Sequence, residues 1–283
     1  MWIAAVAVLA TPTVGEDRPF VFDGKSAKEM RADNSVKMKL VWCPAGEFHL
    51  GTAGATGNEK PVRIMFHQGF WIGQTEVTRK QWEEIMNTTP WKDDVDQRRG
   101  LPGQEAGDYP ASFVNWNQGS QFCEKLTGIE REAGRLPQNV MFSLPSEAEW
   151  EYACRAGTTT TFSFGGDEAR LGEFAWYVGN AWDADERYPH RVGFKKPNPW
   201  GIHDMHGNVD EWCADGDSAE ELPPHTGEIR SATDPKAKYR MIRGGEFSAP
   251  ASHCRSAYRE GGAKPHTRIS STGLRVVLIQ DSH

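Results

Sequence analysis

Glycine and proline interrupt this chain at intervals too short for long helices or long strands. Its 283 residues include 29 Gly and 17 Pro, while 11 Trp supply large apolar anchors. Glycine and proline end or kink regular elements, so a chain of this kind folds into many short elements joined by turns. It is also long enough to bury a core of its own. These features predict an α+β domain that is irregular and loop-rich, with short strands and a few helices.

The charge balance excludes one broad class of partner. The formal net charge is -7, and the basic residues do not form the clusters that phosphate binding requires. We therefore expect no nucleic-acid surface. No apolar run is long enough to span a bilayer. The expected state is a monomer whose partner or substrate is a peptide or a protein.

The N-terminus resembles an export signal. Residues 1–15 carry no charge and end in small residues before the charges of Glu16, Asp17 and Arg18. This pattern is typical of a signal peptide, although the basic start of such a peptide is missing, as in a truncated one. The interpretation is a signal peptide over 1–15, a linker over 16–35 and one domain over 36–281. It places the protein in a periplasm or outside the cell.

Short periodic segments predict the regular elements. Alternation at Met38, Leu40 and Trp42 predicts a strand, and Phe48 with Leu50 predicts its return strand after a Pro-Ala-Gly turn. Further predicted elements are a strand over 70–72, a helix capped by Thr78, a helix that stops at Gly128, a helix capped by Ser146 with Glu149 three residues later, and closing strands over 239–243 and 273–279. Residues 158–238 are expected to be mostly loop.

The stretch DMHGNVDEW, residues 204–212, carries the strongest chemical signal. Asp204 and Glu211 offer carboxylate oxygens, and Gly207 permits a tight turn that can aim its own carbonyl and that of Val209 at one point. A set made only of oxygens suits calcium. The alternative is an acidic turn that caps nearby backbone amides.

Six ordered blocks of the chain resemble the formylglycine-generating enzyme, or sulfatase-modifying factor, family. They are VWCPAGEFHLGT, QTEVTRKQWEEIM, LPSEAEWEYACRAGT, PNPWGIHDMHGNVDEWCAD, MIRGGEFSAPASHCRSAYR and TGLRVVL. The resemblance implies a C-type-lectin-like fold, stabilised by calcium and poor in regular structure. Founding members of the family use copper and O2 to oxidise a sulfatase cysteine to formylglycine, and other branches serve other functions.

The resemblance also assigns a metal site. It implies that Asp204, Gly207, Val209 and Glu211 bind a structural calcium ion. A second calcium site of the family would fall near residues 175–193, where this sequence departs from the enzyme pattern. Asp183, Asp185 and Glu186 in that loop are either a cation site or a solvated acidic face.

The copper site that the resemblance implies is incomplete in this chain. The enzymes hold Cu(I) with two cysteines five residues apart, because soft thiolates select this ion. The second position is Cys254, but the first is Ala249. Glu246 and Asp210 replace a Ser and a Trp of the family pocket, which introduces two acidic groups. The chain thus resembles a divergent branch that lacks the full cysteine pair, so copper is doubtful and Cys254 is its one candidate catalytic residue.

The remaining cysteines fit the same interpretation. The five Cys are an odd number, and the resemblance implies disulfides from Cys123 and Cys154 to positions that are Val276 and Arg259 here. Neither bridge can form. Cys254 is either a core residue or a reactive thiol. His253 is not expected to share a site with it, because neighbours on a strand point to opposite faces.

Other candidate groups leave alternatives open. His203 and His206 are a weak transition-metal pair without a third ligand. Glu147 and Glu151 share a helical face, and we interpret them as solvated charges rather than as a glycosidase pair. Four arginines either form ion pairs with Glu147, Glu149 or Glu211, or line an anion or peptide-carboxylate pocket: Arg243, Arg255, Arg259 and Arg275.

Two functions follow from these patterns. The first is an exported binding scaffold, or an enzyme of altered substrate, with calcium shaping its loops and a degenerate copper site. The alternative is an oxidase that converts a sulfatase cysteine to formylglycine through Cys254. Because fold does not fix function, the choice between them depends on the site.

Overall fold

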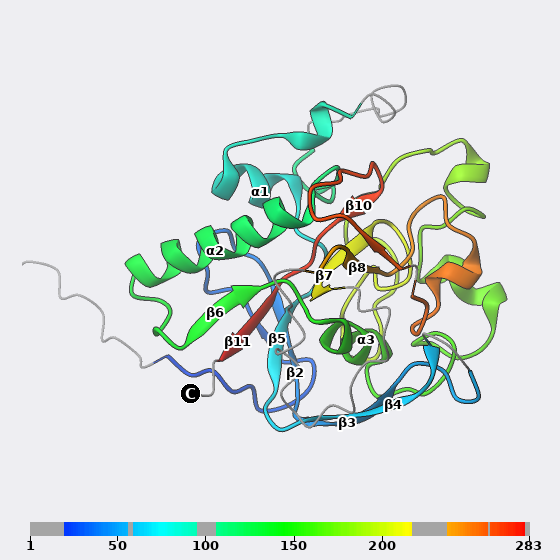
Figure 1. The fold of residues 1–283 in the computed structure, drawn as a ribbon, viewed down its shortest axis with the longest axis horizontal. Helices are drawn as coiled ribbons and strands as arrows, with labels where there is room; N and C mark the ends of the chain where they lie inside the picture. The colour runs from blue at the N-terminus through cyan, green and yellow to red at the C-terminus, as the bar shows by residue number, and fades with distance from the viewer. Residues whose placement is uncertain (1–19, 56–58, 95–105, 217–236, 260, 281–283) are drawn as a thin grey trace, which may run out of the picture.

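A five-stranded antiparallel sheet forms the centre of the fold in a computed structural model of the protein (Figure 1). The structure describes residues 20–55, 59–94, 106–216, 237–259 and 261–280. The order across this sheet is β1 (Met30–Arg31), β2 (Leu40–Cys43), β5 (Phe70–Gly73), β11 (Val277–Gln280) and β6 (Val140–Ser143). The last described strand of the chain, β11, is thus inserted between β5 and β6.

Two smaller sheets contain the other strands of the described residues. β3 (Gly46–Leu50) and β4 (Val62–Phe66) form an antiparallel hairpin. The other sheet has the order β10 (Thr272–Gly273), β7 (Asp210–Gly216), β8 (Arg240–Arg243) and β9 (Gly262–Ala263), in which β10 and β7 are parallel. β7 lies inside the region predicted as loop, and it begins within the DMHGNVDEW stretch.

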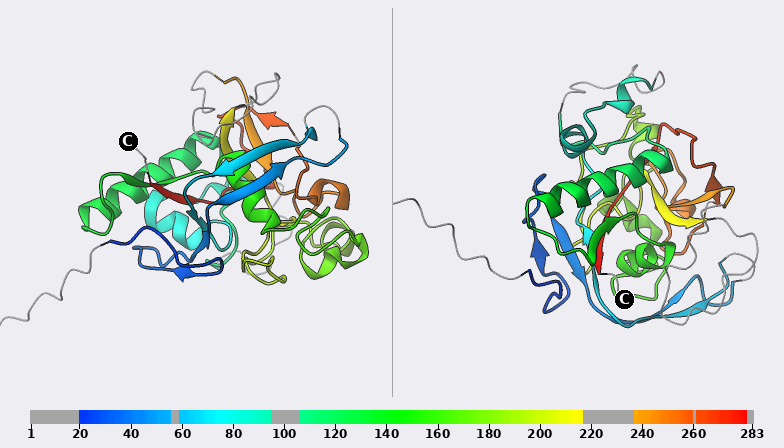
Figure 2. Two further views of the ribbon diagram at one scale, coloured as in Figure 1. Left: turned by 90° about the horizontal axis from the view of Figure 1, so that it is seen from below. Right: turned by 60° about the vertical axis from the view of Figure 1, so that its left-hand side comes forward.

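Helices cover the central sheet on both faces. α1 (Arg79–Met86) and α2 (Trp116–Glu132) pack on one face and α3 (Glu147–Arg155) on the other. Alternation along the strands divides the core accordingly: Leu40 and Trp42 face α1 and α2, whereas Val41 and Cys43 face α3. Figure 2 shows the β3–β4 hairpin running past α3, where Phe48 contacts Tyr152 with ring centroids 5.1 Å apart.

Short 3-10 turns connect the loop-rich remainder of the chain. They are η2 (Pro90–Lys92), η4 (Glu168–Glu173), η5 (Trp182–Ala184) and η7 (Ala251–Cys254). The fold is the predicted α+β, loop-rich, C-type-lectin-like one. In the described part of the chain, no helix has both the length and the apolar composition that crossing a bilayer requires.

The caps predicted for two helices are present. Thr78 caps α1 and Ser146 caps α3, and each accepts a hydrogen bond from the backbone N–H three residues later. α2, however, continues past Gly128 to Glu132. Its last turn is held by Glu130, which is buried and accepts from Ser35 N at 2.7 Å.

Two further expectations differ from the structure. Phe48 and Leu50 do not return along the Trp42 strand: β3 pairs with β4, and β2 pairs with β1 and β5. Where it is described, the segment predicted as a linker packs on the domain, because Phe22 is buried against Trp42 and β1 pairs with β2. The predicted signal peptide, 1–15, lies outside the described residues.

Candidate functional site

The turn that leads into β7 is built around one glycine. Gly207 has φ 129°, and a Cβ there would lie 2.2 Å from the Trp176 carbonyl oxygen. Asp204 and Asn208 on either side also have positive φ, 59° and 69°. Asn and Asp tolerate this conformation better than other side chains. The turn therefore brings Asp204 and Glu211 into the interior, with exposed fractions of 3% and 0%.

Glu211 has strong protein partners. Arg275 donates to its carboxylate from Nε and Nη2, the latter at 2.7 Å, and Trp150 Nε1 donates at 2.7 Å. The same guanidinium donates to the carbonyls of Gly73 and His203, at 2.8 and 3.0 Å. Arg275 thus ties three segments together at the base of β7.

Asp204 is less completely bonded. Its Oδ2 accepts from Gly193 N at 2.6 Å, whereas Oδ1 is buried without a hydrogen-bond partner. Burial raises the pKa of this carboxyl above its ordinary value. An orphaned carboxylate oxygen in a buried position is costly unless a proton or a cation compensates it.

Glu76 joins this group and is absent from the candidates that the sequence indicates. It is 1% exposed, its Oε1 accepts from Asn208 Nδ2 at 2.9 Å, and its Oε2 has no partner. Burial, followed by the charge of Asp204, raises its pKa well above the usual range. In the sequence, Glu76 is marked only by its position in the QTEVTRKQW block, two residues before the helix cap Thr78.

Glu76, Asp204 and Glu211 are the side-chain oxygen donors that a cation at this turn could use. Glu76, Asp204 and Glu211 share the field of one guanidinium, that of Arg275, and two of their oxygens are orphaned. Hard oxygen donors with excess negative charge suit calcium. Among the described residues, no group of three or more His, Cys, Asp or Glu side chains is arranged as a metal site. The predicted calcium site is of a different kind, because two of its four ligands are the backbone carbonyls of Gly207 and Val209.

Cys254 lies at the end of η7 in a closed apolar environment. It is fully buried and clusters with Phe162, Leu171, Ala175 and Ala251. Burial raises the pKa of its thiol far above the usual range, and the charges of Asp210 and Glu246 raise it further. Asp210 and Glu246, which stand where the family pocket has a Trp and a Ser, thus both disfavour the thiolate form of Cys254.

The position of the missing cysteine is a packed one. Ala249 is 6% exposed, and its carbonyl accepts from Val178 N at 3.0 Å. Glu246 is held locally, because its carboxylate accepts from the N–H and the hydroxyl of Ser248. The fold therefore brings Cys254, Asp210 and Glu246 into one region, as the sequence predicts, but it offers no second thiol at Ala249.

Cys154 and His206 lie close to Cys254 without forming a metal site. His206 Nδ1 donates to the Cys254 carbonyl at 2.8 Å, and Nε2 accepts from Ser163 N at 3.1 Å. Burial lowers the pKa of His206 to about 4, so the ring is neutral. Cys154 Sγ is 3.9 Å from both ring nitrogens, so it is aligned with the lone pair of neither. All five cysteines are free and buried.

His253 and Cys254 do face apart, although for a different reason from the predicted one. They lie on a 3-10 turn rather than a strand. His253 stacks on Tyr258 and contacts its hydroxyl at 3.0 Å. The pair is therefore no nucleophile and base.

The four arginines form ion pairs. Arg243 and Arg259 bind Glu147, and Arg275 binds Glu211. Arg255, for which a pocket lining was the alternative, pairs with Glu59 at 2.8 Å rather than with any of the three expected glutamates. Glu147 and Glu151 are 2% and 0% exposed, so the prediction of solvated charges is wrong. Arg243, about ninety residues later in the chain, compensates both.

The loop assigned to a second calcium site carries aromatic and basic groups. Trp176 stacks on His190 with centroids 3.8 Å apart, and Lys195 Nζ lies 3.8 Å from the centroid of the Trp176 ring. Asp183 and Asp185 are exposed, and Asp185 pairs with Arg187 at 3.3 Å. Glu186, the third acid of this loop, is partly exposed, and its carboxylate lies 2.8 Å from His190 Nε2.

Fold and site together define the class of protein. Residues 26–279 match the family described as the sulfatase-modifying factor enzyme 1-like domain, and the chain belongs to this family.

The chain is also similar to individual proteins. It is 27% identical to the formylglycine-generating enzyme of Mycobacterium tuberculosis, covering 84% of this chain and 97% of that one. It is 29% identical to chaperone protein LppX of Paenibacillus barcinonensis, covering 73% of this chain and 81% of that one. Among solved structures, PvdO from Pseudomonas aeruginosa has a TM-score of 0.71 at 26% identity, covering 90% and 99% of the two chains.

Proposed function

We propose that this protein is an exported, calcium-stabilised binding scaffold for a peptide or protein, in which the copper chemistry of the family has been lost. The observation that carries the proposal is the state of Cys254, a buried thiol whose pKa is raised by burial, Asp210 and Glu246. Cu(I) binds thiolates. Each pKa unit above the solution pH costs about 1.4 kcal/mol on deprotonation, and Ala249 supplies no second sulfur.

A role in binding agrees with one of the relatives. The Paenibacillus protein is named a chaperone, and a chaperone acts by contacting another protein. The alternative function, oxidation of a sulfatase cysteine to formylglycine, is supported by the similarity to the Mycobacterium enzyme. The two differ in whether Cys254 takes part in chemistry.

A peptide assay separates these functions. We expect no change in the mass of a sulfatase-type Cys-x-Pro-x-Arg peptide incubated with the protein, Cu(I), reductant and O2, because the site lacks a thiolate pair. We also expect wild type and Cys254→Ser to have the same weak affinity for Cu(I) in competition with a chromogenic chelator. Conversion of the peptide thiol to an aldehyde by wild type, but not by Cys254→Ser, would establish the oxidase instead.

Calcium is proposed as the structural ion of the Asp204 site. When bound, the ion would neutralise the acidic excess around Asp204, with Glu211 and the carbonyls of Gly207 and Val209 as the other predicted ligands. Asp204 offers a free buried oxygen, whereas Glu211 is shared with Arg275. Glu76, three residues after β5, is a further buried carboxyl group beside Asp204, and a bound cation would favour its ionised form.

Removal of calcium should destabilise the protein. At a calcium concentration about 100 times the dissociation constant, binding adds about 2.7 kcal/mol to the free energy of unfolding. We expect CaCl2 to raise the melting temperature by several degrees relative to EGTA, in scanning fluorimetry, and Asp204→Ala to abolish this gain. Asp183→Ala is the matched control, because Asp183 is exposed. Equal calcium responses in the two variants would contradict the proposed ligand.

A further inference from the structure

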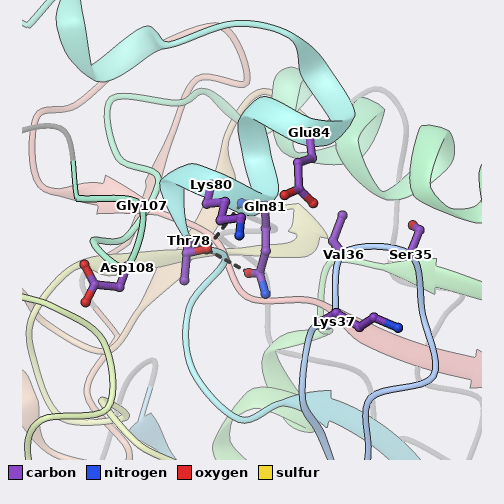
Figure 3. Close-up of a pocket in the computed structure, with 9 residues that line it drawn as sticks. All are labelled: Ser35, Val36, Lys37, Thr78, Lys80, Gln81, Glu84, Gly107 and Asp108. Carbon is purple, nitrogen blue, oxygen red and sulfur yellow. Dashed lines mark hydrogen bonds between the residues drawn. The ribbon is translucent and has the colours of Figure 1, made fainter.

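A groove outside the Cys254 and Asp204 regions lies beside the start of α1. It has a volume of about 410 Å³, within the range of small-ligand pockets. Three segments distant in sequence form its walls: residues 35–37, the first turns of α1, and residues 107–108. In Figure 3, Lys80 and Glu84 project from α1, and Lys37 lies on the facing loop.

Hydrogen bonds hold the walls in place. The buried Asn34 side chain bonds both the N–H and the carbonyl of Met38, at 2.8 and 2.7 Å, and so closes the loop that carries Lys37. Lys80 N donates to Gly107 O at 3.0 Å. A Cβ at Gly107 would lie 2.7 Å from Lys80 Cβ, so only glycine permits this approach. The backbone of the groove is therefore preformed, so that only its exposed side chains must be ordered on binding.

Three charged side chains in the groove are not neutralised by the protein. Within the described residues, Lys37, Lys80 and Glu84 take part in no hydrogen bond or ion pair through their side chains. Asp108, in contrast, pairs with Arg191 at 3.4 Å. The groove thus presents two free ammonium groups and one free carboxylate.

The start of α1 adds to the positive field. Its first turn contains no acidic residue, so nothing in it offsets the positive end of the helix dipole. The backbone N–H groups are already used: Arg79 N donates to Tyr109 O, Lys80 N to Gly107 O and Gln81 N to the Thr78 hydroxyl. Recognition of an anion must therefore come from the lysine side chains.

Glu84 adds a negative charge to a groove that otherwise presents two lysine ammonium groups. It follows Lys80 by four residues on the same helix face, with Lys preceding Glu, the less favourable order for a pair within the helix. The two groups are available to a ligand rather than bound to each other. A ligand with a carboxylate and an ammonium group matches this arrangement.

We propose that this groove binds a small zwitterion of the amino-acid or short-peptide class. The ligand carboxylate lies against Lys37 and Lys80, and its ammonium group lies against Glu84. This inference is independent of the proposed scaffold function, because it uses none of the residues around Cys254 or Asp204.

Titration of the 15N-labelled full chain with three matched probes tests the site. Glycylglycine carries both charges, acetyl-glycylglycine lacks the ammonium group and glycylglycinamide lacks the carboxylate. We expect saturable shifts of the Thr78, Gln81 and Gly107 amide signals with glycylglycine, with a dissociation constant on the order of 1 mM. The amide should bind at least tenfold more weakly, and the acetylated probe severalfold more weakly.

Charge-removing variants assign the shifts to the groove. Lys80→Gln should weaken glycylglycine binding about tenfold. Lys37→Asn should act likewise and keeps the backbone, because Lys37 has φ 53° and Asn tolerates that conformation. Glu84→Gln should make glycylglycine and its acetylated form equal. Lys125→Gln, exposed on α2, is the control.

The outcomes are decisive in both directions. Melting temperatures within a degree of wild type, on the order of the experimental error, would show that each variant is folded. Absence of a saturable shift up to about 50 mM glycylglycine, equal binding of all three probes, or equal effects of Lys80→Gln and Lys125→Gln would overturn the proposal.

Discussion

Arg275→Met is expected to lower the free energy of unfolding by about 3–5 kcal/mol, because it leaves a buried carboxylate without its partner. Glu211 and Arg275 are both fully buried. The change also removes donors from the carbonyls of Gly73 and His203 and the counter-charge of Glu76 and Asp204. Urea unfolding followed by tryptophan fluorescence in EGTA measures the loss.

Two matched variants show whether the buried charge is the cause. Arg63→Met breaks a pair of similar geometry with Glu47, which is exposed to solvent, so no measurable destabilisation is expected. Arg275→Met with Glu211→Gln should recover part of the loss, since the remaining partner is then uncharged. A loss for Arg275→Met no greater than that for Arg63→Met would refute this account.

The elements that could be predicted from the sequence are those fixed by local chemistry. Thr78 and Ser146 cap helices because their side chains satisfy N–H groups three residues away. The alternation in β2 follows from the two faces of one strand. The ordered motif blocks identified the family, and Cys123 and Cys154 are free, as expected from the loss of their family partners.

The features that escaped prediction depend on partners distant in sequence. β3 pairs with β4 rather than with β2, because the central sheet fills the position beside β2 with β5, and the choice depends on the whole fold. Glu147 and Glu151 resemble surface charges until Arg243 is placed against them.

The candidate site also contains features that follow from local sequence and others that depend on tertiary contacts. The turn that carries Asp204, Gly207 and Glu211 could be predicted, since φ 129° at position 207 requires glycine, whereas their role as ligands stays a prediction. Glu76 could not, because its chemistry arises only when Asn208 and Asp204 reach it across the fold. The raised pKa of Cys254 also required the tertiary structure, because burial raises it most and the charges of Asp210, at the start of β7, and Glu246 raise it further.

The acidic start of α3 should make stability depend on pH. Asp215 is buried and accepts from Glu147 N, the first residue of the helix. Burial, then the neighbouring charge of Glu147, raises its pKa from 3.8 to about 7. Between these two values the unfolded chain has lost the proton and the folded chain keeps it. The contribution of Asp215 to stability therefore falls as the pH rises from about 4 to about 7, and is constant above that range.

Asp215→Asn should remove this dependence. The amide oxygen can still accept from Glu147 N, and the side chain carries no charge at any pH. Relative to wild type, we expect the variant to be unchanged near pH 4 and more stable at pH 8, by at most about 4 kcal/mol at 1.36 kcal/mol per pKa unit.

Asp215→Asn must be compared with wild type because His206 makes stability change with pH in the opposite direction. Its folded pKa of about 4 lies below the ordinary 6.5, so the unfolded chain binds the extra proton and stability falls as the pH decreases from about 6.5 to about 4. The difference between Asp215→Asn and wild type cancels this contribution. Chemical unfolding at half-unit intervals from pH 4 to pH 8 measures that difference, with the exposed Asp183→Asn as control. Parallel profiles for wild type and Asp215→Asn would mean that Asp215 ionises normally in the fold, and that α3 begins on a carboxylate rather than on a carboxylic acid.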